Sequence, residues 1–277
     1  MIEDVHRGRV RPSRMTSEFD TDTAVVSKGA DVFAATITDR WSTPVGPNGG
    51  YLLATATRAL GEVSPMPHPF AVTGHFLRPA KPGDAEVRTE LVKTGRRHAV
   101  AQARFVQGEK ELMVVVATFA DLTNMNGREF VLGEPPPATP PGDAADPVAV
   151  LEAEAVPPIL RRVDFRSAEV PGFAVGKPSG RPEFMSWMRF ADGRAADPLS
   201  LVFFADAMPP PVFEIGEFMS STVEMTVHVR AVPAEGWLAM RVRTRYVIGG
   251  YHEEDAELWD SSGKLVAQSR QLALLGS

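Results

Sequence analysis

The sequence predicts an α+β fold that is built twice along the chain, for three reasons. Each half contains an extended run, an apolar helical run, and then four runs with the alternation typical of β-strands. A single offset of 152 residues superposes the halves, so that Tyr51 falls on Phe203 and Arg78 on Arg230. Between the halves, 11 of the 24 prolines lie within residues 135–182. We therefore expect a duplicated unit with a proline-rich linker between its copies.

The first unit is expected over residues 20–122. Val32–Ile37 has the composition of a strand, and Tyr51–Leu60 is a helical run closed by Gly61. Four strand-like runs follow at about 70–79, 85–94, 98–107 and 111–121, and the turns between them have the length of hairpin turns. A sheet of this size can wrap around one apolar helix.

The second unit is expected over residues 181–277, after a linker at residues 123–180. Its first strand is predicted at Phe184–Phe190 and its helix at Leu199–Met208. The helix should stop at Pro209–Pro211, because proline lacks the N–H group that continues the hydrogen-bond ladder. The strand-like runs that follow lie at about 219–231, 236–248, 251–259 and 264–275.

Composition narrows the class of protein. A net charge of -6 argues against a nucleic-acid partner, which would require a basic surface. The chain contains no cysteine, which excludes disulfides, thiolate metal sites and a cysteine nucleophile. The sequence has neither the apolar core of a signal peptide nor an apolar run of about 18 residues, so we expect no membrane association and a cytoplasmic protein.

Asp206 is the single charged residue in the predicted helix Leu199–Met208. At helical spacing it shares a face with Leu199 and Phe203, which places the carboxylate toward the core. A carboxylate in that position is costly without partners, and buried acids of this kind are candidates for functional sites. The alternative is a structural acid that is bonded to backbone groups or paired with an arginine such as Arg243.

The positions at which the two halves differ favour the second half as the functional one. The offset of 152 residues places Asp206, Thr222 and Gln271 opposite Ala54, Phe70 and Phe119. A carboxylate, a hydroxyl and an amide can together hold one water molecule, with the carboxylate as the base and the other two groups fixing its orientation.

The sequence resembles the type II acyl-CoA thioesterases of bacteria, the double hot-dog family, over nearly the whole chain outside its N-terminal tail and the linker. The matching segments are Gly49–Ala54, His75–Pro79 and Val115–Phe119 in the first half, and Ala205–Asp206, Thr222–Glu224 and Val266–Gln271 in the second. The resemblance implies a double hot-dog fold: two antiparallel β-sheets, each wrapped around a long central helix.

The resemblance also implies that the protein hydrolyses an acyl-CoA substrate with a water molecule activated by Asp206, Thr222 and Gln271. Three further residues are predicted to bind the substrate. Gly49 and Gly50 begin the first helix and are candidate donors to the oxyanion, because helix N-termini present unpaired N–H groups. Arg78 is a candidate for contact with the phosphates of coenzyme A. The chain departs from the family where three prolines closely follow Asp206, which leaves the acyl chain length open.

Two other functions remain open from the sequence. Hot-dog hydratases and dehydratases use a histidine with an acid, and Gly74–Phe76 contains His75. In a regular strand His75 points away from the face of Phe70, although a bulge would change this. A non-catalytic acyl-CoA binding protein is the second alternative.

No metal site and no cofactor are expected, because the six histidines have no metal-binding spacing. His252–Asp255 follows Gly249–Gly250 and is interpreted as the solvated tip of a hairpin. An exposed sheet edge in each half predicts a homodimer or a higher homo-oligomer.

Overall fold

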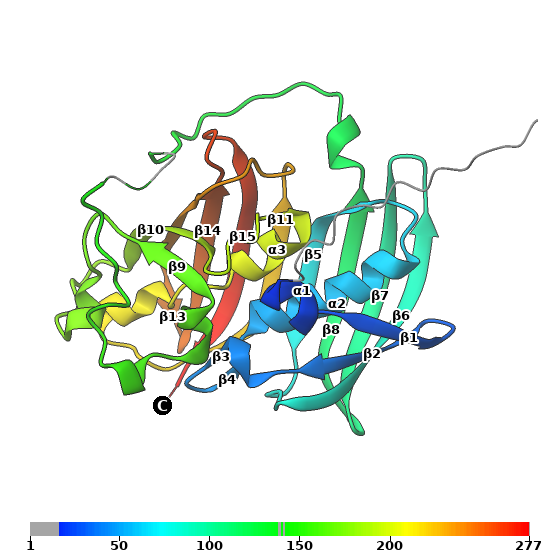
Figure 1. The fold of residues 1–277 in the computed structure, drawn as a ribbon, viewed down its shortest axis with the longest axis horizontal. Coiled ribbons are helices and arrows are strands. Elements are labelled where there is room, and N and C mark those ends of the chain that lie inside the picture. The colour runs from blue at the N-terminus through cyan, green and yellow to red at the C-terminus, as the bar shows by residue number, and fades with distance from the viewer. Residues whose placement is uncertain (1–16, 138–139, 141, 277) are drawn as a thin grey trace, which may run out of the picture.

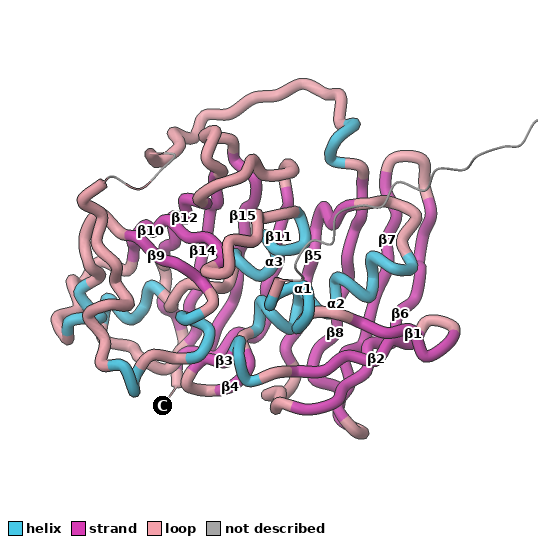
Figure 2. Tube along the Cα trace, viewed as in Figure 1, coloured by secondary structure: helices cyan, strands magenta, loops and turns pink. Residues whose placement is uncertain are grey.

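The computed structural model describes residues 17–137, 140 and 142–276, and it shows one large antiparallel sheet with helices on one face (Figures 1 and 2). The first half contains α1 (Glu18–Asp22), β1 (Val25–Gly29), β2 (Val32–Ile37), β3 (Ser42–Thr43), β4 (Gly46–Pro47), α2 (Gly49–Val63), β5 (His68–Phe76), β6 (Gly83–Thr94), β7 (His98–Gln107) and β8 (Lys110–Ala120). The second half contains β9 (Val163–Arg166), β10 (Glu183–Phe190), α3 (Pro198–Phe204), β11 (Ser220–Val229), β12 (Leu238–Arg243), β13 (Val247–Ile248), β14 (Tyr251–Trp259) and β15 (Leu265–Leu275). Short 3₁₀ turns lie at Asp39–Trp41, Leu122–Asn124, Ala153–Ala155, Pro158–Arg161, Gly172–Val175 and Pro211–Ile215.

The order of the strands confirms the duplication. Reading inward from one edge, the first half runs β1-β2-β6-β7-β8-β5, and the second half repeats this order as β9-β10-β12-β14-β15-β11. The offset of 152 residues carries β5 onto residues 220–228, and β11 covers Ser220–Val229. β9 lies inside residues 123–180 and pairs with β10, so part of the segment expected to be a linker belongs to the sheet.

The expectation of two separate sheets is corrected by the pairing of β5 with β11. These strands meet antiparallel, from Glu224 opposite His75 to His228 opposite Ala71, and they join both halves into a sheet of 13 strands. An exposed sheet edge was expected in each half as a site for self-association, but the β5 edge of the first half and the β11 edge of the second pair with each other within one chain.

The second expectation that fails is a long central helix in each half. α2 has 15 residues, whereas α3 has only seven and ends four residues before the predicted end at Met208. The residue before a proline avoids helical geometry, and Pro209 begins the triplet that redirects the chain into the turn at Pro211–Ile215. α2 and α3 pack against each other on the same face of the sheet (Figure 1).

Aromatic side chains fill the space between the helices and the sheet. Phe19, Trp41 and Phe203 are fully buried, and their rings meet edge-on or tilted at centroid separations of 5.1–5.7 Å. Such pairs add specific orientation to the burial of apolar area. This cluster fixes the position of α3 and hence of the turn that follows it. No helix in the described residues has the length and apolarity needed to cross a membrane.

Candidate active site

The turn after α3 places Asp206 against the start of α2. α3 begins with a capping box in which Asp197 and Ser200 bond to each other's backbone N–H groups, and it has proline at its first position. At the other end, the N–H of Asp206 bonds to the carbonyl of Phe203 at 3.0 Å, which closes a tight turn. Asp206 therefore lies just beyond the helix. The helical spacing had predicted a position within it.

The carboxylate of Asp206 is bound at the N-terminus of α2. Its Oδ2 accepts hydrogen bonds from the N–H of Gly50 at 2.7 Å and from Nδ2 of Asn48 at 2.9 Å. Asn48 is also the N-cap of α2, because its Oδ1 accepts from the N–H of Tyr51 at 2.9 Å. The partial positive charge at a helix N-terminus favours an anion in this place. Oδ1 of Asp206 has no protein hydrogen-bond partner within the described part of the chain.

Two opposing effects determine the protonation of Asp206. Burial raises the pKa of its carboxyl group to about 6, although the hydrogen bonds from Gly50 and Asn48 oppose the shift. The group is therefore ionised at neutral pH, with a pKa close to the working range of a general base. The alternative of a structural acid bonded to backbone groups describes Oδ2, which accepts from the N–H of Gly50. Its partner is a helix N-terminus and not Arg243. The other oxygen remains available for chemistry.

Glycine is required at position 50 by the contact between the two helices. A Cβ atom there would lie 2.7 Å from Cβ of Asp206 and 2.8 Å from the carbonyl oxygen of Phe203. Backbone forms part of this contact, so a side chain cannot be accommodated by changing a rotamer.

We expect Gly50→Ala to lower the free energy of unfolding by about 1–3 kcal/mol, as overpacking typically does, and to displace the Asp206 carboxylate. Gly61→Ala is the matched control, because its Cβ would meet only Phe119 at 3.8 Å. In α2 that change should raise stability by up to about 1 kcal/mol. Urea denaturation of both variants measures the difference, and equal stabilities would contradict the crowding at Gly50.

Thr222 and Gln271 are brought together as the sequence predicted. Oγ1 of Thr222 donates to Oε1 of Gln271 at 2.8 Å, and this bond joins β11 to β15. Gln271 is buried and Thr222 is half-buried. A bulge in β11 between Thr222 and Glu224 moves the hydroxyl out of the regular register and toward the amide.

Glu254 is the residue of this region that the sequence interpretation missed. It lies on β14 directly opposite Gln271 of β15, with only 2% of its surface exposed. Burial, together with the negative charge of Asp206, raises its pKa well above the usual range, while contact with the Gln271 side chain opposes the shift. Glu254 therefore lies beside Gln271, at a place where the charge of Asp206 acts on it.

The interpretation of His252–Asp255 as a solvated hairpin tip is wrong. His252 and Glu254 are both buried, whereas Glu253 and Asp255 bond to Arg245. The alternation of buried residues continues through Ala256 and Leu258, and this pattern was the signal that could have located Glu254.

The three predicted substrate-binding residues differ in their surroundings. Gly49 lies beside Asp206, since a Cβ at Gly49 would be 3.1 Å from its Oδ2. No described group accepts the N–H of Gly49, whereas the N–H of Gly50 is already bonded to Asp206. Arg78 is exposed and donates through Nη1 to the carbonyl of Glu111 at 2.9 Å. Gly49 is thus the better placed of the two amides for an oxyanion.

His75, the residue of the hydratase alternative, is exposed on the outer side of the sheet. β5 does contain a bulge, between Pro69 and Ala71. Beyond the bulge the alternation is regular, with Val72 and Gly74 buried and His75 exposed. His75 therefore does not share the buried face on which Gln271 and Glu254 lie.

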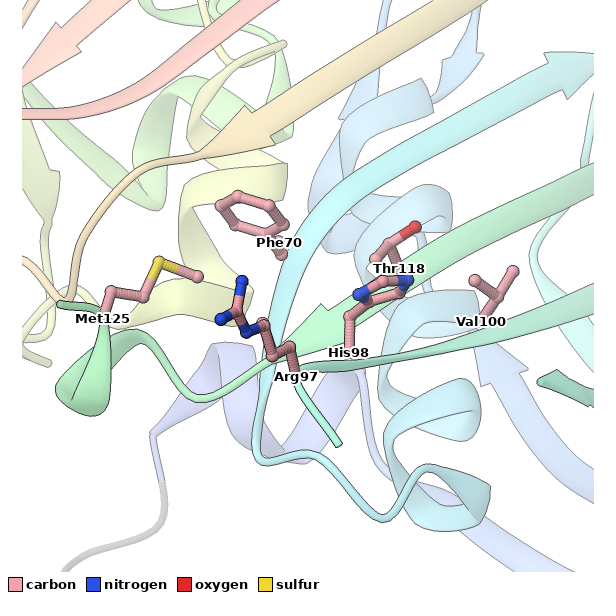
Figure 3. Close-up of a pocket in the computed structure, with 7 residues that line it drawn as sticks. Phe70, Arg97, His98, Val100, Thr118 and Met125 are labelled. Carbon is pink, nitrogen blue, oxygen red and sulfur yellow. The ribbon is translucent and has the colours of Figure 1, made fainter. Parts of the chain in front are cut away.

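A surface pocket occupies the position in the first half that corresponds to Thr222. It has a volume of about 340 Å³ and is lined by Phe70, Arg97, His98, Val100, Thr118, Ala120 and Met125 (Figure 3). A second pocket, of about 380 Å³, includes His252, Arg270 and Leu272, which the offset of 152 residues relates to Val100, Thr118 and Ala120. The two pockets are therefore equivalent by the duplication, and neither is lined by Asp206.

Solved structures with the same architecture define the class of fold. A structure from Thermobifida fusca described as a thioesterase II is 30% identical, with a TM-score of 0.86, and the match covers 95% of this chain and 99% of the other. A protein of unknown function with a hot-dog fold from Alicyclobacillus acidocaldarius is 24% identical, with a TM-score of 0.84 and the same coverage. The protein therefore has the hot-dog fold.

The family follows from the sequence profiles of known domains. The profile of acyl-CoA thioesterase N-terminal domains matches residues 37–120, and the profile of the C-terminal domains matches residues 133–275. The chain belongs to this acyl-CoA thioesterase family. An uncharacterised protein of Mycobacterium tuberculosis is 28% identical to it over 278 residues, which cover 88% of this chain and 91% of the relative.

Proposed function

We propose that the protein hydrolyses acyl-CoA thioesters to a free carboxylic acid and coenzyme A, with Asp206 as the general base. The observation that carries the proposal is the environment of Asp206. Its Oδ2 is held by Gly50 and Asn48, its Oδ1 has no partner in the described residues, and its pKa of about 6 leaves it ionised at neutral pH. A base must be both positioned and unprotonated, and this carboxylate is both.

The reaction needs a positioned water, a base and a donor for the oxyanion. Asp206 takes a proton from the water while the oxygen of the water forms a bond to the thioester carbonyl carbon. The resulting oxyanion accepts a hydrogen bond from the N–H of Gly49. When this intermediate collapses, the carbon–sulfur bond breaks and the coenzyme A thiolate receives the proton held by Asp206. Thr222 and Gln271 orient the water, because their mutual hydrogen bond fixes the direction of each group.

A panel of acyl-CoA substrates of graded chain length, with detection of free thiol, tests the proposal. Release of thiol above the uncatalysed rate for at least one chain length is expected. Hydration of an enoyl-CoA without thiol release would assign the protein to the hydratases instead. Thermal stabilisation by acyl-CoA with neither reaction would assign it to the binding proteins, and either result overturns the proposal.

Thr222→Val removes the hydroxyl that holds Gln271 and keeps a β-branched side chain suited to a strand. We expect kcat/KM for acyl-CoA hydrolysis to fall about tenfold, which corresponds to the loss of one hydrogen bond of about 1.4 kcal/mol. Thr226→Val on the same strand is the control, because Thr226 bonds to Thr73 and Glu224 on the outer face. If both variants hydrolyse the substrate at the rate of the unmodified protein, Thr222 has no part in the reaction.

A further inference from the structure

Glu254 belongs to a row of inward-facing residues that crosses the second half of the sheet. On β14 the buried positions alternate, so that Glu254 faces the same side as Ala256 and Leu258. Its register partner on β15 is Gln271. On the other side of β14, Arg243 of β12 pairs with Asp255, and the next residue, Thr244, is buried. The row therefore presents a hydroxyl, a carboxyl and an amide to the face that carries Asp206.

Glu254 has no cationic partner for an ionised carboxylate within the described residues. Oε2 of Glu254 and Oγ1 of Thr244 are both buried without a hydrogen-bond partner in the described residues. The ionisable side chains near Glu254 on its own strand are His252 and Asp255. Those on neighbouring elements are Arg243 of β12, Arg270 of β15 and Asp206 after α3. None of them forms an ion pair with Glu254 within the described ranges.

None of these neighbours compensates a charge on Glu254. Arg243 and Arg270 lie on the outer face of the sheet, because they alternate with the buried Val242 and Gln271. Asp255 is outward-facing and is bonded by Arg245 and Arg270. His252 accepts or donates a hydrogen bond with Ser220 at 2.8 Å, and burial lowers its pKa, which keeps the imidazole neutral. Asp206 is negative. Burial and the negative charge of Asp206 both raise the pKa of Glu254, so Asp206 ionises first and Glu254 retains its proton near neutral pH.

We propose that Glu254 is the protonated member of a carboxyl pair with Asp206 and positions Gln271 as a neutral acid. This inference rests on the proposed thioesterase function for its kinetic consequence. As a neutral acid, Glu254 holds the amide of Gln271 without placing a second negative charge beside the base. If it ionised, the new charge would repel the oxyanion that forms on the substrate.

The pH dependence of kcat/KM for acyl-CoA hydrolysis tests the proposal, with Glu254→Gln as the variant. In the unmodified protein the rate should fall about tenfold per pH unit both below the pKa of Asp206 and above that of Glu254, the two values belonging to the pair. Glutamine has the shape of the neutral acid but cannot ionise. Glu254→Gln should therefore lose the alkaline decline and keep the midpoint of the acidic limb.

Glu257→Gln is the matched control. Glu257 lies on the same strand, half-buried on the outer face and 3.9 Å from Arg241, and this variant should keep both limbs of the profile. A shift of the acidic limb to lower pH in Glu254→Gln would overturn the proposal, because it would mean that Glu254 is charged while Asp206 titrates. An unchanged alkaline limb in Glu254→Gln would overturn it as well.

Infrared spectroscopy supplies a readout that does not depend on activity. Protein with ¹³C-labelled glutamate side chains should show the carbonyl band of one protonated carboxyl group at pH 7, and the band should remain in Glu257→Gln. Its absence from the unmodified protein would overturn the assignment even if Glu254→Gln does not fold. If the band is present but no acyl-CoA is hydrolysed, the proposed function fails while the protonation of Glu254 stands.

Discussion

Asp206→Asn is expected to lower kcat/KM for acyl-CoA hydrolysis by about 100- to 10,000-fold, the range typical for the loss of a general base. The asparagine amide oxygen can accept the hydrogen bonds that Gly50 and Asn48 donate to Oδ2, so the junction of α2 with the turn after α3 should persist. The variant removes the basicity of the side chain and keeps its shape. Thiol release under substrate-limiting conditions measures the effect.

A control separates this loss from a general effect of removing a charge. Glu217 is an exposed acid in the segment between α3 and β11, and Glu217→Gln should hydrolyse acyl-CoA at the rate of the unmodified protein. Circular dichroism should show the same sheet content in both variants. Retention of more than about one tenth of the activity in Asp206→Asn would be inconsistent with general-base catalysis by this residue.

The duplication could be predicted from the sequence because it leaves a periodic trace in each half. Alternation marks the strands, glycines and prolines mark the turns, and one offset relates β5 to β11 and β7 to β14. The proximity of Thr222 and Gln271 followed from the same alignment. These features depend on local pattern and on the comparison of two similar halves.

The features that were missed depend on contacts between residues far apart in sequence. Gly50 and Asp206 are separated by 156 positions, and no sequence spacing indicates that the Asp206 carboxylate binds at the N-terminus of the helix that contains Gly50. The pairing of β5 with β11 could not be predicted either, because the local pattern of a strand does not indicate which other strand it pairs with. For the end of α3 the sequence predicted only the latest possible residue, because prolines indicate where a helix cannot continue and not how many residues earlier it ends.

Glu254 shows a different limit of the sequence. The glycines before it are typical of a tight turn, and the three acids in succession favour exposure. The buried face of β14 nevertheless begins within two residues of that turn, at His252. A charged residue type in a strand thus says little about its face unless the alternation of the whole strand is followed to its end.

The contribution of Asp206 to the stability of the protein should decrease as the pH rises. Its pKa is about 6 in the folded protein and about 3.9 in an unfolded chain. Between these values Asp206 binds more protons in the folded state than in the unfolded state, so its contribution to the free energy of unfolding falls as pH increases from about 4 to about 6. The shift corresponds to a loss of about 2 to 3 kcal/mol, complete above the folded pKa.

Asp206→Asn cannot ionise and should escape this loss. Urea denaturation at pH 4 and at pH 7 should therefore show that the variant gains about 2 to 3 kcal/mol relative to the unmodified protein over this interval. Asp260 is the opposite case, because N–H groups of Ala234, Ser262 and Lys264 outweigh burial and lower its pKa. Asp260→Asn should accordingly be less stable than the unmodified protein at pH 7. A constant difference between Asp206→Asn and the unmodified protein would show that the pKa of Asp206 is not raised, and the carboxylate would then be a weaker base than the proposed function requires.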